Sequence, residues 1–264
     1  MRLFKPTTKW LFVSITSTIL CFGCTQEPKH FTNDVLNRMT PVKNQGDSET
    51  CWIYAMLAAI ETEHIERGDS VNLSAAYVEY MLQKEPNAPE SKRGMGVTCI
   101  NMIQKYGLCG FDAYRKPDKD IVPPQTVFML GAVYTPQEFA RSVCAPDEYI
   151  ALTSNEEEPY NQLTDVNTDD NWEHNRFWNI PMDSLIAKTE RAIRSRHGVC
   201  WESKGHAMAI VGLGRDAQQN RYFIMKNSWG DDDPDHGLVY MTYERFQKET
   251  LAVEMTREAF FHTP

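Results

Sequence analysis

The chain has 264 residues, of which 42% are hydrophobic, and its formal net charge at pH 7 is −9. This composition supplies enough apolar material for the core of one or two domains and argues against a disordered chain. The acidic balance argues against nucleic acid as a partner, because phosphate binding depends on a basic surface.

The amino-terminal segment has the pattern of an export signal. A basic start is followed by an uncharged stretch at residues 10–22 and then by Gly23 and Cys24. This ending resembles the lipobox of bacterial lipoproteins. We therefore interpret residues 1–23 as a lipoprotein signal peptide and expect Cys24 to carry a lipid that anchors the chain to a bacterial membrane, on its periplasmic or surface side. A simply cleaved secretory signal and an uncleaved anchor are the alternatives, and each also places the domain outside the cytoplasm.

Residues 24–38 form a short polar stretch, which we interpret as a tether, and helical periodicity begins after it. A long helix is expected from Cys51 to about Arg67, because apolar residues recur at helical spacing without Gly or Pro. Three further helices are expected at about 97–106, from Thr135 towards Cys144 behind a capping box, and at 182–197 with Gly198 as the stop.

Later in the chain the period changes to that of strands. Strands are expected at residues 149–153, 199–202, 207–212, 222–226 and 238–242, with a last one within 250–260. Helices first and strands later predict an α+β domain, and the interface between its two parts is a common place for a cleft.

A candidate nucleophile stands at the start of the first long helix. There Cys51 would lie at the positive end of the helix dipole, which lowers the pKa of a thiol and favours the reactive thiolate. Gln45 ends a Pro-Val-Lys-Asn-Gln run six residues earlier, and Trp52 follows the cysteine directly.

Two later motifs supply candidate partners for this cysteine. His206 opens an apolar run of small residues, where a strand would present it as a general base. Asn227, 21 residues further on, begins an Asn-Ser-Trp-Gly motif, in which Trp229 would shield a histidine–asparagine hydrogen bond from water.

These three blocks, in this order, resemble the papain-like cysteine peptidases. The resemblance implies a two-lobed fold over residues 39–264, in which a helical lobe with a central helix faces an antiparallel β-sheet lobe. It implies Cys51 as nucleophile, His206 as base and Asn227 as the residue that orients the base. It also implies that the Gln45 amide and the backbone N–H of the nucleophile form the oxyanion hole. The implied activity is hydrolysis of peptide or protein substrates through an acyl-enzyme, with no metal or other cofactor.

Within that family the chain is most similar to the bleomycin hydrolase branch. Ser48 stands where cathepsins have a disulfide-forming cysteine, three places before the nucleophile. Further similar stretches are Asn101 with 105–107, 147–164, 180–183 and 240–242 before Phe246.

Two positions depart from the family pattern. Glu49 replaces a glycine two places before the nucleophile, where its backbone would not adopt positive φ cheaply and its charge would oppose a thiolate. The paired glycines that line the cleft are reduced to Arg93-Gly94, so Gly94 is the expected substrate contact. An acyl transferase with the same site and a catalytically inactive binding lipoprotein are the alternative functions.

The remaining cysteines leave two interpretations open. Cys99, Cys109, Cys144 and Cys200 would form two disulfides in an oxidising compartment, in one of three pairings, or they are small buried apolar residues. None has the spacing of a zinc site. Because few residues follow the last expected strand, we expect no long carboxy-terminal arm and a monomer whose open cleft accepts internal peptide bonds.

Overall fold

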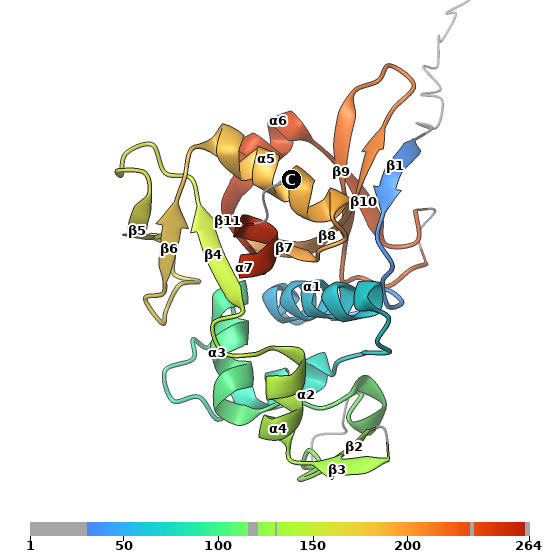
Figure 1. Ribbon diagram of the computed structural model, residues 1–264. Helices are drawn as coiled ribbons and strands as arrows, with labels where there is room; N and C mark the ends of the chain where they lie inside the picture. Colours follow the sequence, from blue (N-terminus) through green and yellow to red (C-terminus); the bar gives the residue numbers. More distant parts are fainter. Residues whose placement is uncertain (1–30, 116–120, 130, 233–234, 262–264) are drawn as a thin grey trace, which may run out of the picture.

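One helix, α1 (Cys51–Arg67), lies between two lobes (Figure 1). The computed structural model describes residues 31–115, 121–129, 131–232 and 235–261 of the chain. Most of α1 is buried on all sides, which fits its sequence, because apolar residues occupy successive positions rather than a single stripe. The helix ends before Gly68, whose left-handed backbone caps it. Both ends of α1 lie where the sequence predicts them.

The helical lobe packs against one side of α1. It contains three helices, a 3-10 turn and a small hairpin: α2 (Ala75–Leu82), α3 (Gly96–Tyr106), α4 (Pro136–Val143), η1 (Phe111–Ala113), β2 (Val127–Met129) and β3 (Ala132–Tyr134). The expected capping box of α4 is present, since the side chains of Thr135 and Glu138 each accept from the other's backbone N–H. Helix α2, which the sequence analysis missed, is short and also begins with a serine cap, Ser74.

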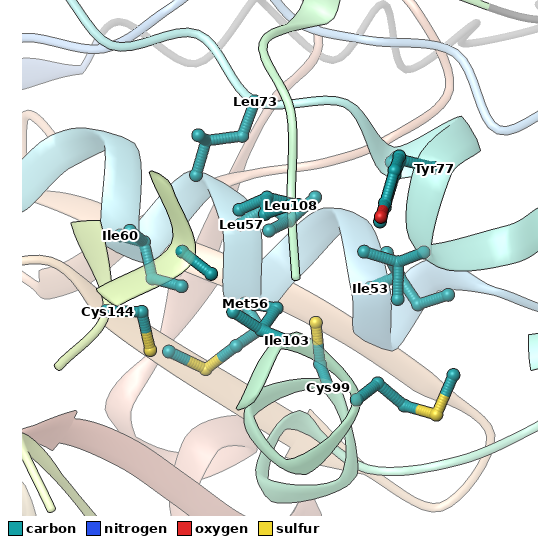
Figure 2. Close-up of a cluster of buried hydrophobic side chains, with 14 of the residues drawn as sticks. Ile53, Met56, Leu57, Ile60, Leu73, Tyr77, Cys99, Ile103, Leu108 and Cys144 are labelled. Atoms are coloured by element: carbon teal, nitrogen blue, oxygen red, sulfur yellow. The ribbon is translucent and has the colours of Figure 1, made fainter. Parts of the chain in front are cut away.

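The cysteines of this region contribute to its apolar core. Figure 2 shows the sulfur atoms of Cys99 and Cys144 within the cluster formed by α1 and the helical lobe. Cys109 belongs to the same cluster, and all five cysteines in the described part of the chain are free. The interpretation as buried apolar residues therefore holds here, and the two-disulfide alternative does not.

The other lobe is built on a mixed sheet. Within the described residues its nine strands follow the order β10-β9-β8-β7-β11-β4-β6-β5, with β1 paired to β8, and the neighbours are antiparallel except β4 and β6. The strands are β1 (Thr32–Leu36), β4 (Tyr149–Thr153), β5 (Gln162–Asp165), β6 (Arg176–Asn179), β7 (Val199–Ser203), β8 (His206–Arg215), β9 (Arg221–Lys226), β10 (Leu238–Thr242) and β11 (Thr250–Thr256).

Strand β8 carries the contact between the lobes. Ala207, Ala209 and Val211 face α1, whereas Met208 and Ile210 face the opposite core, which is covered by α5 (Met182–Arg194) and α6 (Tyr243–Glu249). This alternation is the period of two of a strand. Small residues on the α1 side allow the helix to lie close to the sheet.

Two element boundaries differ from the sequence predictions. Helix α5 ends at Arg194 rather than near 197, because Arg196 adopts a positive φ of 68° and its N–H donates to the Ile193 carbonyl. The last strand ends at Thr256, whose hydroxyl accepts from Ala259 N–H and begins α7 (Arg257–Phe261).

The amino-terminal region also differs from the expectation. Strand β1 lies within the stretch expected to be a tether and pairs with β8, so this part belongs to the sheet. Its side chains are mostly exposed, which is why no apolar pattern marks it. The expected signal peptide and Cys24 lie outside the described residues. Among the described helices, none has the length and apolar character needed to cross a bilayer.

The contact between α1 and the start of β7 predicts a sharp effect at Gly198. A Cβ added there would overlap the backbone carbonyl of Ala59 in α1. Because relief requires moving one backbone against the other, we expect Gly198→Ala to cost roughly 1–3 kcal/mol of unfolding free energy, which is about 2–4 °C of Tm for each kcal/mol. Thermal unfolding measures this, with Gly110→Ala as the control, since a Cβ at Gly110 meets nothing closer than 3.6 Å. Equal Tm values for the two variants would contradict the contact.

Candidate active site

A narrow chamber opens between the lobes at the first residue of α1. The helical lobe contributes Cys51, Trp52 and Gly94 to its wall, and the sheet lobe contributes His206 and Ala207. Helix α1 packs along β8, and both elements begin at this chamber. Their first residues, Cys51 and His206, therefore both line it. The fold thus brings together Cys51, Gly94 and His206, three predicted site residues that lie far apart in the sequence.

The orientation of the His206 ring is set by Asn227. Its Nε2 lies 2.9 Å from the side-chain oxygen of Asn227, which also accepts the backbone N–H of Ser228 at 2.8 Å. A backbone N–H can only donate, so the atom that faces the ring is the amide oxygen and Nε2 carries the ring proton. The other ring nitrogen, Nδ1, keeps its lone pair. Trp229 stacks on the ring, with centroids 5.0 Å apart.

Gln45 is held by the motif that contains Asn227. Its side-chain oxygen accepts from the Ser228 hydroxyl at 2.5 Å, and its backbone N–H donates to the Ser228 carbonyl at 2.8 Å. Its Nε2 donates one hydrogen to the Ser48 carbonyl at 2.5 Å, which leaves the second hydrogen for another acceptor. The N–H of Cys51 belongs to the first turn of α1, whose N–H groups have no acceptor within the helix. This role of Ser228 was not predicted from the sequence, although Ser228 stands inside the Asn-Ser-Trp-Gly motif.

The loop before Cys51 is fixed from both lobes. Asn44 forms an antiparallel bridge with Trp229, and the Gly230 N–H donates to the Lys43 carbonyl at 3.2 Å. At the other end of the loop the Thr50 hydroxyl donates to Glu79 of α2 at 2.5 Å. The residues that would contact an oxyanion are therefore tied to the loop that orients the base.

Burial dominates the pKa of both reacting groups. It raises the pKa of the Cys51 thiol, although the backbone N–H groups of Ala207 and Trp52 and the charge of Arg93 act in the opposite direction. The helix start alone led us to expect a net lowering, and that expectation is wrong because desolvation outweighs it. Burial also lowers the pKa of His206, against the hydrogen bond to Asn227. Burial therefore disfavours an isolated charge on either group.

Glu49 does not strain the nucleophile loop. The positive φ in this loop falls at Gly46, at 61°, and Glu49 is absent from the positive-φ residues of the described chain. The expected backbone penalty at position 49 is therefore wrong. The Glu49 carboxylate lies 4.0 Å from an Nη atom of Arg93 and is half exposed, so a cation beside it balances its charge.

Gly94 is required by its neighbours. A Cβ at this position would lie 2.8 Å from the indole of Trp52, and the indole N–H of Trp52 donates to the Lys92 carbonyl at 3.0 Å. The loop before α3 is therefore pressed against the residue that follows Cys51. This places the Gly94 backbone on the chamber wall, where the sequence analysis expected a substrate contact.

A buried acidic pair lies beneath the chamber. Glu202 on β7, which lines the chamber, and Glu254 on β11 are 3% and 0% exposed, and three of their four carboxyl oxygens have no donor among the described residues. The Gly96 N–H donates to the fourth, on Glu202, at 2.6 Å. With the Cys200 thiol they form the only group in the described part of the chain whose donors, within 4.8 Å of one another, would suit a metal ion. No local sequence pattern marks this group, because its members come from two strands far apart in the sequence.

Protons can compensate the charge of this pair without a metal ion. Burial raises the pKa of both carboxyl groups, that of Glu254 to about 7, and each negative charge would oppose the other. A proton held on Glu202 can be donated to Glu254, which satisfies two of the unpartnered oxygens.

The fold and this site define a class, the two-lobed cysteine peptidases. The chain belongs to the papain family of cysteine proteases, whose family model matches residues 28–260. The predicted α+β two-lobed fold is thereby confirmed.

Named relatives agree with this assignment. Ananain from Ananas comosus is 24% identical over 200 residues, which cover 73% of this chain and 49% of ananain. Zingipain-2 from Zingiber officinale is 25% identical over 206 residues, covering 76% of this chain and 81% of that relative. The chain thus spans about half the length of ananain.

Two bacterial structures show the same fold at low identity. PepW from Lactobacillus rhamnosis is 14% identical with a TM-score of 0.63, covering 86% of this chain and 82% of PepW. Xylellain, a cysteine protease from Xylella fastidiosa, is 19% identical with a TM-score of 0.50, covering 84% of each chain.

The acidic pair predicts a pH-dependent stability. A carboxyl whose pKa is raised by folding contributes stability that is present below its unfolded pKa, near 4.5, and is lost as the pH rises through about 7. The glutamine of Glu254→Gln has no proton to lose, so the variant does not undergo this loss of stability. We therefore expect the Tm difference, variant minus native chain, to increase by several degrees from pH 5 to pH 8. The exposed Glu156→Gln is the control. A Tm difference that is the same at both pH values would show that the pair carries no such linkage.

Proposed function

We propose that this chain hydrolyses peptide bonds with Cys51 as nucleophile. The observation that carries the proposal is the hydrogen bond from His206 Nε2 to Asn227, which leaves Nδ1 as a base in the chamber that Cys51 lines. Because the ring is half-buried and is held in one orientation by Asn227, it is suited to take a proton from a thiol.

The first half of the reaction forms a thioester. As the Cys51 sulfur attacks the carbonyl carbon of a peptide, its proton passes to His206 Nδ1 and the carbonyl oxygen takes up negative charge. The free hydrogen of the Gln45 amide and the N–H of Cys51 are the donors for that oxyanion. When the intermediate collapses, the C–N bond breaks and His206 returns the proton to the leaving amine.

The second half releases the acyl group. His206 takes a proton from water, the hydroxide oxygen attacks the thioester, and the C–S bond breaks as the sulfur recovers a proton. An amine in place of water would give acyl transfer by the same steps, so the two reactions differ only in the acceptor. The presence of all the reacting groups supports catalysis over the alternative of an inactive binding protein.

We expect Cys51→Ala and His206→Ala to abolish peptide turnover, because each removes a group whose bond or proton changes in the reaction. Gln45→Ala should retain a weak activity, with a loss of roughly 10²–10³ in kcat for one oxyanion donor. Asn227→Ala should also leave a residue of activity, since it orients the base without reacting. Steady-state kinetics on a set of fluorogenic peptides measures these effects.

Labelling by a thiol-directed epoxide separates the possible failures of this prediction. The native chain should be labelled once, at Cys51, and Cys51→Ala should not be labelled, whereas Cys144→Ala, which lacks a buried thiol, should react like the native chain. Near-native turnover by Cys51→Ala would overturn the mechanism. Products formed with an added amine would distinguish transfer from hydrolysis.

We further propose that the chain is a bacterial lipoprotein anchored through Cys24, with its domain on the periplasmic or surface side of the membrane. The support is the sequence of residues 1–24 alone. We also propose that the chain belongs to the bleomycin hydrolase branch of the family. Ser48 supports this, because its hydroxyl donates to the Gln45 carbonyl at 2.8 Å, where cathepsins have a disulfide.

We propose a monomer in which no carboxy-terminal arm occupies the chamber. The described carboxy-terminal end lies against α5, where Lys188 donates to the Phe260 carbonyl at 2.8 Å and Phe260 is buried. Through Phe261, the chain therefore stays outside the chamber, whose lining comes from other segments.

Metabolic labelling with a fatty-acid analogue tests the anchor. We expect the native chain to incorporate the label and Cys24→Ala to lose it, because the thiol is the acceptor of the lipid. Cys144→Ala should be labelled as strongly as the native chain. Equal labelling of the native chain and Cys24→Ala would exclude lipidation at this cysteine.

A further inference from the structure

An ion pair joins the two lobes beside the chamber. Arg93, directly before Gly94, donates from Nε and Nη2 to the two carboxylate oxygens of Asp170 at 2.8 and 2.9 Å. Asp170 lies on the loop between β5 and β6, so the pair connects the helical lobe to the sheet lobe. Two parallel N–H···O bonds fix the guanidinium in both position and plane.

The backbone on the Arg93 side is also fixed. The indole N–H of Trp172 donates to the Arg93 carbonyl at 3.0 Å, and the neighbouring Lys92 carbonyl accepts from Trp52. The guanidinium lies against Gly205, the residue before His206, because a Cβ at Gly205 would be 3.3 Å from Nη2. The ion pair therefore has a defined place next to the catalytic histidine.

This pair lies on the wall that two hollows share. The chamber at Cys51 has a cavity volume of about 20 Å³, room for about one water molecule. A second hollow of about 700 Å³ lies beyond it. The two hollows share the residues Arg93, Thr168, Asp170, Gly205 and Leu251.

We propose that the ion pair between Arg93 and Asp170 (the Arg93–Asp170 bridge) limits how many substrate residues can precede the scissile bond. The inference rests on the proposed peptidase function. A peptide whose carbonyl lies at Cys51 and whose backbone runs along Gly94 towards the second hollow passes Arg93, which lines both hollows. With the bridge closed, only a short acyl portion is accommodated on that side, and a longer one has to displace the bridge to reach the second hollow.

The preferred substrates are therefore short peptides, or chains cut near their amino ends. This differs from the expectation of an open cleft that accepts internal bonds. The short carboxy terminus led to that expectation, whereas the constriction comes from an arginine in place of a glycine at position 93.

A series of fluorogenic peptides with one, two and four residues before the reporter tests the bridge. For the native chain we expect kcat/KM to fall by about tenfold or more between two and four residues, since misplacement at a reacting centre costs up to about 10²-fold. Arg93→Gly and Asp170→Asn should each remove most of that fall. Arg93→Lys should do so in part, because an ammonium lacks the bidentate geometry.

Asp165→Asn is the matched control. It breaks the exposed ion pair between Asp165 and Arg176, at 3.0 Å on the same lobe, and should leave the length preference as it is. Active-site titration with the thiol-directed epoxide corrects every rate for the fraction of folded, reactive enzyme.

Three outcomes are distinguishable. A native chain that cuts four-residue peptides as fast as two-residue peptides would overturn the role of the bridge and leave the peptidase function intact. An unchanged preference in both Arg93→Gly and Asp170→Asn would do the same. A native chain that neither cuts any peptide nor reacts at Cys51 would instead contradict the peptidase function itself.

Discussion

The site depends on the burial of α1 between two lobes that come from different parts of the chain. The helix lies against β7 and β8, with Ala59 in backbone contact with Gly198. Burial of apolar surface along this interface, at roughly 25 cal/mol per Å², is what holds the lobes together. Because α1 and β8 both begin at the chamber, the same packing that stabilises the fold also sets the distance between Cys51 and His206.

Polar contacts at this interface fix how α1 is oriented relative to the segments around it. Glu61 of α1 is fully buried and accepts from the Thr40 hydroxyl at 2.5 Å and from the Leu73 N–H at 2.6 Å. Lys226 donates to Thr40 at 2.8 Å, and burial lowers its pKa to about 8. A buried carboxylate is tolerated only with such partners. The network ties the residue before Asn227 to α1, and so the part of the chain that orients His206 is fixed to the helix that carries Cys51.

Low polarity governs the chemistry of the chamber. Burial opposes the charged form of Cys51, of His206 and of the acidic pair below them. A proton that moves between two neighbouring groups creates charges that stabilise each other, which burial favours over isolated ions. Arg93 is the cation that acts on the thiol, and its hydrogen bonds to Asp170 fix its position. The same side chain therefore influences both the reactivity of the site and the space in front of it.

The sequence by itself determined the α+β class, the bounds of α1, the helices α3, α4 and α5, and the strands of the sheet other than β1, β5 and β6, because these follow from local periodicity and capping. It also singled out Cys51, His206 and Asn227 through short motifs. Only the tertiary structure decided the net pKa of Cys51, the partners of Gln45, the acidic pair and the Arg93–Asp170 bridge. The physical reason is that desolvation and side-chain pairing depend on which distant segments come together, and no local pattern records that.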